Sequence, residues 1–209
     1  MPVLRNIGSL ACCPDNGLQN EVGAIAGASL AWEGDTISWA GPETELPDQY
    51  SAGRQFDAAG RLVIPGLIDC HTHLAFGGWR AHEFRQRLEG RTYLEIARAG
   101  GGILSTVGKT RAASRQDLVE FGATVLSAMS ELGVTCAECK SGYGLEMETE
   151  VRQLKAYRDL SRRQPVRVVA TFLGAHTLPA EFKEERDAYL TELMDRMIPR
   201  VAEKGLACF

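Results

Sequence analysis

The chain has 209 residues, of which 44% are hydrophobic and 24% are charged, and its formal net charge is −4. The composition is typical of a globular protein, and the acidic balance argues against a nucleic-acid partner and against a polybasic membrane anchor. No apolar run reaches the ~20 residues that cross a bilayer. We therefore expect a cytoplasmic protein in which the six cysteines are thiols.

Residues 1–60 predict part of a small β domain. Two short β-like runs, at residues 28–32 and 36–40, flank the sequence Glu33-Gly34-Asp35, which is typical of a turn. The pattern therefore predicts a hairpin. Because so short a segment holds little core, we expect it to be the N-terminal part of a composite β-sandwich domain.

Residues 61–209 alternate between strand-like and helix-like patterns. An apolar run over residues 62–68, interrupted by Pro65-Gly66, predicts a buried strand with a break inside it. Further strands are predicted over residues 134–139 and 166–173, with the start of another over 206–209. Helices are predicted over residues 92–99, 114–132, 146–162 and 181–197, with a separate turn opening at Pro199. Residues 102–110 are glycine-rich and predict a loop.

Two helix starts carry a specific capping signal. Thr92 with Glu95, and Ser114 with Asp117, are spaced as capping boxes, in which the first side chain and the fourth bond each other's backbone amides. The alternation as a whole predicts an α/β fold with a parallel sheet. A closed (β/α)8 barrel needs about 250 residues. We expect the first three to four βα units of a truncated barrel of this kind.

The strongest chemical signal is the sequence Asp69-Cys70-His71-Thr72-His73, which follows the first of these strands. Side chains two apart on a strand point to the same side, so both imidazoles can face one ion. Barrel enzymes carry their chemistry at this carboxyl end of the strands. Paired imidazoles suit zinc or iron, whereas the alternative is two solvated histidines near a loop.

The run from Ile64 to Leu74, which contains both histidines, resembles the metal-binding signature of the amidohydrolase superfamily. Four further motifs resemble the imidazolonepropionase family within it, in the same order and spacing. They are Phe76-Gly77-Gly78-Trp79-Arg80 with Glu83-Phe84, Gly100-Gly101-Gly102-Ile103, Lys140 to Leu145, and Thr171 to His176. The resemblance covers nearly the whole chain from residue 60 onward, and residues 1–60 match loosely.

The resemblance implies the hydrolysis of 4-imidazolone-5-propanoate to N-formimidoyl-L-glutamate, a step of histidine degradation. It assigns one divalent metal ion, zinc or iron, to His71 and His73. It assigns the small-molecule substrate to Arg80, Tyr143 and His176, with Arg80 suited to the propionate carboxylate. Family members are roughly twice as long as this chain. The resemblance therefore places the catalytic acid or base and the remaining metal ligands beyond residue 209, and it implies a homodimer for the full-length form.

Several alternatives stay open at this point. His176 can instead be a core histidine or a third metal ligand. Lys140 can be a carbamylated metal-bridging lysine, although we expect a structural residue paired with Glu138, two positions earlier on the same strand. The chain can belong to another amidohydrolase, such as a cyclic amidase or a base deaminase, or it can be a non-catalytic truncated protein. We expect the 209-residue chain alone to have little or no activity.

Overall fold

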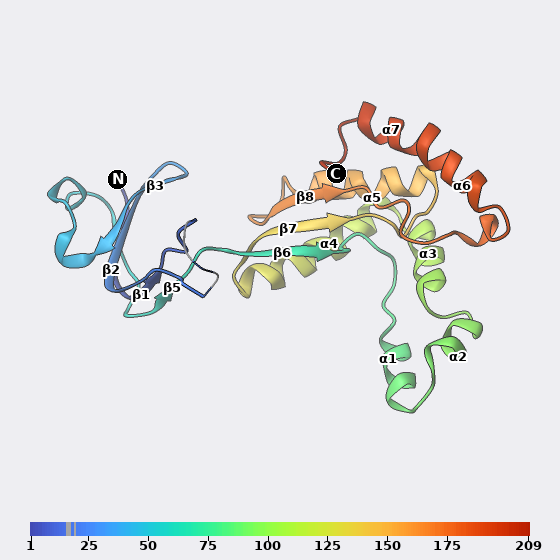
Figure 1. The fold of residues 1–209 in the computed structure, drawn as a ribbon, viewed down its shortest axis with the longest axis horizontal. Helices are drawn as coiled ribbons and strands as arrows, with labels where there is room; N and C mark the ends of the chain where they lie inside the picture. Colours follow the sequence, from blue (N-terminus) through green and yellow to red (C-terminus); the bar gives the residue numbers. More distant parts are fainter. Residues whose placement is uncertain (16–17, 19) are drawn as a thin grey trace. The chain divides into compact units, whose positions relative to one another are not determined.

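The computed structural model describes residues 1–15, 18 and 20–209 (Figure 1). The chain divides into two compact units, Met1–Gly66 and Leu67–Phe209. Within the described residues, every helix is too short or too polar to cross a membrane. The six cysteines, all of them described, form no disulfide, as the sequence predicts.

The first unit is built on one five-stranded sheet. Its strands are β1 (Val3–Ala11), β2 (Ala24–Glu33), β3 (Thr36–Pro42), β4 (Gln55–Asp57) and β5 (Leu62–Val63). The order is β3-β2-β1-β4, and β5 also pairs with β1. β2 and β3 are antiparallel and turn at Gly34, which has a φ of +55°, so the predicted hairpin is confirmed. Ile7, Leu10 and Ala28 form one small core of this sheet.

The predicted broken strand over residues 62–68 is wrong. β5 pairs with β1 in the first sheet, whereas the residues after Pro65-Gly66 open β6 (Leu67–Thr72) in the second unit. The run is not buried either, since Leu62 is 65% and Ile68 is 71% exposed. The physical reason is that, among the described residues, β5 and β6 are each paired with one strand only, so their apolar side chains are only partly covered.

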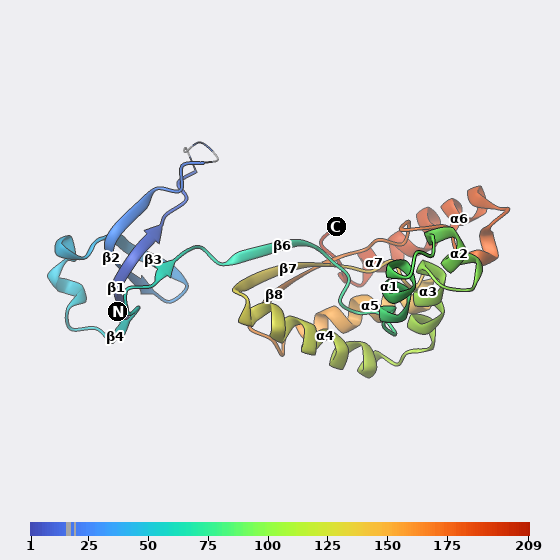
Figure 2. The same ribbon diagram turned by 90° about the horizontal axis from the view of Figure 1, so that it is seen from below.

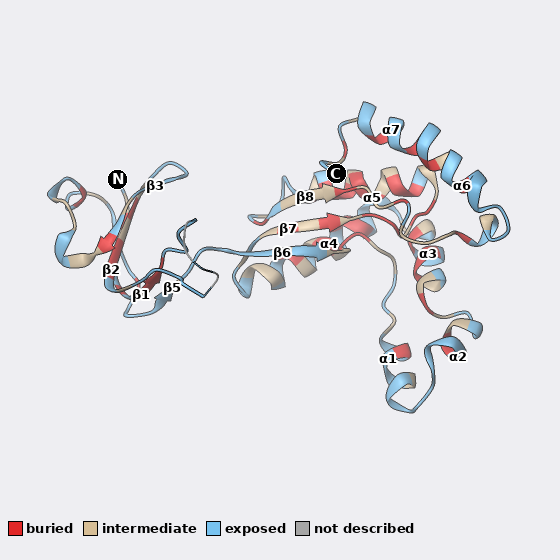
Figure 3. Cartoon of the chain, viewed as in Figure 1, coloured by how far each residue is buried: buried red, intermediate tan, exposed pale blue. Residues whose placement is uncertain are grey.

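The second unit contains a parallel three-stranded sheet in the order β6-β7-β8, which makes this an α/β fold. β7 spans Val134–Lys140 and β8 spans Arg167–Thr171. Helices α4 (Arg115–Glu131) and α5 (Met147–Leu160) lie side by side against one face (Figure 2). Their shared core is almost fully buried, and Figure 3 shows buried residues in α5 and toward the end of β7. It includes Leu118, Leu126, Ala137, Leu154, Tyr157 and Leu160.

Both predicted capping boxes are confirmed. In α2 (Tyr93–Arg98), the Glu95 amide donates to Thr92 Oγ1 at 3.3 Å. In α4, the Asp117 amide donates to Ser114 Oγ at 3.1 Å, and the Ser114 amide donates back to Asp117 Oδ2 at 2.9 Å. The helix predicted over residues 114–132 ends at Glu131, and Leu132, which follows it, is 77% exposed.

Two stretches form helices that the sequence did not predict as such. α1 (Ala81–Leu88) starts without a side-chain cap, so no local signal marked it. The expected glycine-rich loop at residues 102–110 is instead the start of α3 (Ile103–Ala112), because Gly102 turns the chain with a φ of +74° and apolar helix-compatible residues follow.

The predicted helix over residues 181–197 is interrupted. A 3₁₀ turn (Ala180–Phe182) precedes α6 (Arg186–Glu192), and a π-helical segment (Leu193–Met197) leads into α7 (Ile198–Glu203). Pro199 lies in the first turn of α7, and its missing amide removes one α-helical hydrogen bond at this point. Residues 206–209 form no assigned strand, although the Cys208 amide donates to the Ala170 carbonyl of β8 at 2.8 Å.

Candidate metal and substrate site

The carboxyl ends of the three parallel strands bring distant residues together. The register pairs Thr72 with Cys139 and Lys140 with Thr171, so the segments that follow these residues leave the sheet at one edge. His71 lies at the end of β6 and His73 follows the strand, while the other two segments are the turn 141–145 and the turn 173–176. Parallel sheets commonly bind ligands at this edge.

The rings of His71, His73, Tyr143 and His176 form a cluster at this edge. The ring centroids of His71 and His73 lie 5.7 Å apart. The His73 ring stacks on that of His176 at 4.7 Å with an angle of 15°, and Tyr143 lies 4.8 Å from His73 and 5.2 Å from His176. The structure therefore brings four of the residues predicted from separate sequence motifs together in one cluster of rings.

His73 has the electrostatic character of a metal ligand. Burial, together with the nearby rings of His176 and His71, lowers the pKa of His73 from 6.5 to about 4. The imidazole is therefore neutral at pH 7, the form in which a ring nitrogen binds metal. Its Nδ1 atom is buried and has no hydrogen-bond partner, which is unusual for a buried polar atom. His73 thus fits a metal that would use or orient this ring.

The described residues do not by themselves form a metal site. Within them, no group of three or more His, Cys, Asp or Glu side chains is placed to hold an ion. A catalytic zinc site needs about three protein ligands. A metal at His71 and His73 therefore requires ligands additional to this pair.

Arg80 and Tyr143 line a cavity of about 420 Å³, beside the histidine cluster. Its walls include the aromatic residues Phe76, Trp79 and Tyr93. The size falls within the range of small-molecule pockets. A cationic group in an aromatic pocket suits a small acid with a flat ring.

Glu83 holds the Arg80 side chain at the start of α1. One Glu83 oxygen accepts from Arg80 Nη1 at 3.2 Å, and the other accepts from the Gly102 amide at 2.9 Å. The Glu83 carboxylate and its bond to Gly102 are buried, whereas the Arg80 side chain is 35% exposed. The sequence motif included Glu83 but gave no reason to assign it this role.

His176 is tied to the Tyr143 loop, residues 142–145. Its Nδ1 lies 3.0 Å from the Gly142 carbonyl oxygen. A Cβ at Gly142 would lie 2.8 Å from that of His176 and 2.7 Å from the Leu173 carbonyl oxygen, so only glycine allows this approach. The contact holds the turns after β7 and β8 together.

Lys140 pairs with Glu138, as the sequence predicts. Glu138 Oε1 accepts from Lys140 Nζ and also from Thr171 Oγ1, the latter at 2.7 Å. The hydrogen bond from Lys140 is the main cause that lowers the pKa of Glu138. Lys140 therefore forms an ion pair with a neighbouring carboxylate on its own strand.

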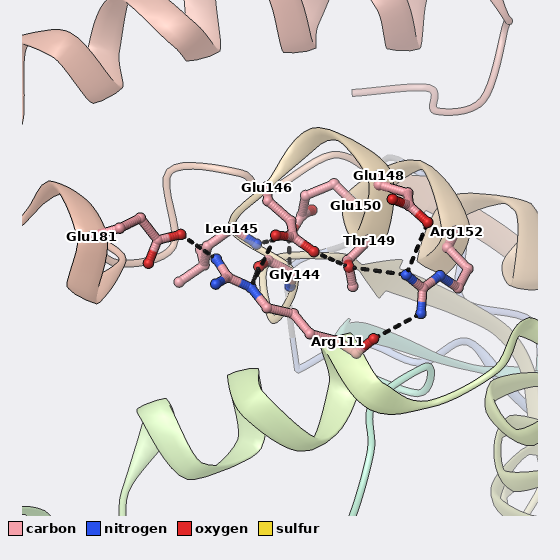
Figure 4. Close-up of polar contacts among 9 residues, drawn as sticks. All are labelled: Arg111, Gly144, Leu145, Glu146, Glu148, Thr149, Glu150, Arg152 and Glu181. Atoms are coloured by element: carbon pink, nitrogen blue, oxygen red, sulfur yellow. Dashed lines mark hydrogen bonds and ion pairs between the residues drawn. The ribbon is translucent and has the colours of Figure 1, made fainter.

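The residue that sequence reasoning missed is Glu150, in the first turn of α5. Its carboxylate accepts hydrogen bonds from three backbone amides of the Tyr143 loop, and Figure 4 draws Glu150 with two of these residues, Gly144 and Leu145. The sequence feature that could have pointed to Glu150 is an acidic residue in the first turn of a helix, shortly after Gly142 and Gly144. Such residues are common at helix starts, because their charge interacts favourably with the helix dipole.

The fold is similar to that of solved hydrolases. A triazine hydrolase from Arthrobacter aurescens matches with a TM-score of 0.56 at 19% identity, covering 93% of this chain and 42% of that one. Atrazine chlorohydrolase from the same organism, solved with zinc, matches with a TM-score of 0.54 at 19% identity, covering 82% and 35%. At this identity the likeness concerns the α/β fold alone.

No family model matches the chain, but curated relatives do. The imidazolonepropionase of Brucella abortus (strain S19) is 49% identical over 186 residues, which are 89% of this chain and 46% of that protein. The imidazolonepropionase of Paraburkholderia phymatum is 48% identical over 197 residues, 94% of this chain and 48% of that protein. The chain is therefore a homologue of the imidazolonepropionases that spans about half of their length.

Proposed function

We propose that this chain supplies metal- and substrate-binding residues for the hydrolysis of 4-imidazolone-5-propanoate to N-formimidoyl-L-glutamate in histidine degradation. The observation that supports the proposal is the convergence of His71, His73, Tyr143 and His176, in a chain 49% identical to an imidazolonepropionase over 186 residues. Because the chain spans about half of such relatives, the complete activity belongs to a longer protein. The 209-residue chain alone should turn over little or no substrate.

His71 and His73 are the proposed ligands of one divalent metal ion, zinc or iron. The neutral state and unpartnered Nδ1 of His73 support this assignment, as does the zinc in a fold neighbour. When bound, such an ion supplies an activated water for attack on the ring amide. The remaining ligands and the catalytic acid or base would come from the other half of the longer protein.

Arg80, Tyr143 and His176 are the proposed substrate-binding residues. Arg80 can bind the propionate carboxylate bidentately from the wall of the 420 Å³ cavity. Tyr143 belongs both to this cavity and to the histidine cluster, so a molecule anchored at Arg80 can present its ring near the metal ligands. His176, stacked on His73, is placed for a polar contact with that ring.

The proposed architecture is the first part of a (β/α)8 barrel, from residue 61 to 209, preceded at residues 1–60 by part of a composite β domain. The exposed apolar side chains of the edge strand β6, among them Leu67 and Ile68, support the presence of a further strand beside it. For the longer protein we also propose a cytoplasmic location and a homodimer.

A chimera tests the proposal directly. This chain replaces the aligned half of the Brucella abortus imidazolonepropionase, and turnover of 4-imidazolone-5-propanoate is measured together with metal content. We expect turnover by the chimera, none by the 209-residue chain, and a loss of turnover of at least about a hundredfold with His71→Asn or His73→Asn. A folded, metal-loaded chimera that leaves this substrate intact but hydrolyses a triazine or deaminates a base would overturn the assignment.

A further inference from the structure

Glu150 carries a carboxylate that is buried next to the Tyr143 loop. The residue is 1% exposed and lies in the first turn of α5. Its Oε1 accepts from the amides of Gly144 and Leu145, each at 2.8 Å, and its Oε2 accepts from the Gly142 amide at 3.0 Å. The loop thus turns its amides inward around one acid, and Tyr143 lies in the middle of it.

The loop adopts a backbone conformation that needs such support. Gly142 has a φ of +104° and Leu145 has a φ of +55°, and the second value is unfavourable for a leucine. Several amides that converge on one anion form a nest, which the anion stabilises. Burial raises the pKa of Glu150, while hydrogen bonds from the Ser141 hydroxyl and from the loop amides oppose that rise.

Arg111 holds the same loop from the opposite side. From α3, its Nε donates to the Gly144 carbonyl at 2.7 Å, and its Nη2 donates to Glu181 Oε1 at 2.6 Å (Figure 4). Glu181 belongs to the 3₁₀ turn that follows β8. The guanidinium therefore ties the loop to two other segments of the second unit.

We propose that Glu150 and Arg111 are positioning residues that clamp the Tyr143 loop from both sides and so hold the Tyr143 phenol beside His73 and His176. This inference rests on the proposed function, in which Tyr143 binds substrate. The hydrogen bonds of Glu150 and Arg111 described above go to the loop backbone, to Ser141 and to Glu181, and none of them goes to a ring of the cluster. Both act through the loop.

Amide hydrogen exchange on the full 209-residue chain tests the clamp without reference to activity. Glu150→Gln keeps the shape of the side chain but places an amide group where two oxygens accept. We expect the Gly144 and Leu145 amides to exchange about tenfold faster or more, while the Ala137 amide in β7 keeps its protection. The matched control is Glu148→Gln on the same helix, whose side chain is 89% exposed, and it should leave these rates within about twofold.

Arg111→Gln provides a second variant, which decides the question if Glu150→Gln unfolds the chain. It should speed exchange at Leu145 and at Gly144 with the same protection of Ala137. Unchanged loop exchange in a folded Glu150→Gln or Arg111→Gln chain would overturn the clamp. An equal rise in the loop and in β7 would do so as well, since it indicates general destabilisation.

A double-mutant cycle in the chimera tests whether Glu150 acts through Tyr143. Glu150→Gln should raise KM about tenfold, and in a Tyr143→Ala background the same change should have an effect of less than about twofold. Additive effects would contradict the positioning role. If the unsubstituted chimera has no turnover, the proposed function fails, and the exchange measurement still decides the clamp.

Discussion

Tyr157→Phe should destabilise the second unit more than its small chemical change suggests. The side chain is fully buried, and its hydroxyl donates to the Lys140 carbonyl at 2.7 Å and accepts from the Ala75 amide at 3.2 Å. These two bonds join the end of β7 to the segment that follows His73. Removal of the hydroxyl leaves the buried Ala75 amide and the partly buried Lys140 carbonyl without this partner, at a cost of about 1–3 kcal/mol for the amide and about 1 kcal/mol for the carbonyl.

We therefore expect a loss of about 2–4 kcal/mol in the free energy of unfolding. Urea unfolding monitored by circular dichroism at 222 nm is the assay, because every α-helix of the described residues lies in the second unit. Tyr93→Phe, at a side chain that is 60% exposed, is the control and should change stability by less than about 0.5 kcal/mol. A Tyr157→Phe chain as stable as this control would refute the reasoning.

Three further predictions concern stability. With EDTA present to remove metal ions, the low pKa of His73, about 4 against 6.5, means that the unfolded chain binds a proton first as the pH falls. Because the ring is partly open to solvent, His73 should contribute up to about 2 kcal/mol less at pH 5 than at pH 7, and His73→Gln should remove that difference in urea titrations. Gly142→Ala should cost at least about 1 kcal/mol more than Gly90→Ala, because both have positive φ but only Gly142 lacks space for a Cβ; equal midpoint shifts in urea would argue against the clash. Ser114→Ala should lower stability by about 1 kcal/mol through loss of its cap, whereas Ser127→Ala, exposed in the middle of α4, should not; thermal unfolding compares the two.

The sequence predicts best where the physical signal is local. The capping boxes at Thr92 and Ser114 need only residues three positions apart, and the hairpin at Gly34 needs only a turn between two β-like runs. The alternation of strands and helices also predicts that His73 and Tyr143 meet, because parallel strands end at one edge.

The remainder depends on contacts that a local pattern does not encode. The run at residues 62–68 is apolar enough for one buried strand, yet its halves pair with different sheets. The π-helical segment before Pro199 arises from a lost backbone bond rather than from a change in amphipathic pattern. Glu150 resembles any acid near a helix start until the fold wraps the Tyr143 loop around it.

The position of a bound metal tests the central claim most directly. Crystals of the chimera grown with zinc and measured at the zinc absorption edge would locate the ion by anomalous scattering. We expect one strong peak within coordination distance, about 2.1 Å, of a ring nitrogen on each of His71 and His73. A single peak elsewhere in a folded, active chimera, with neither ring as a ligand, would contradict it.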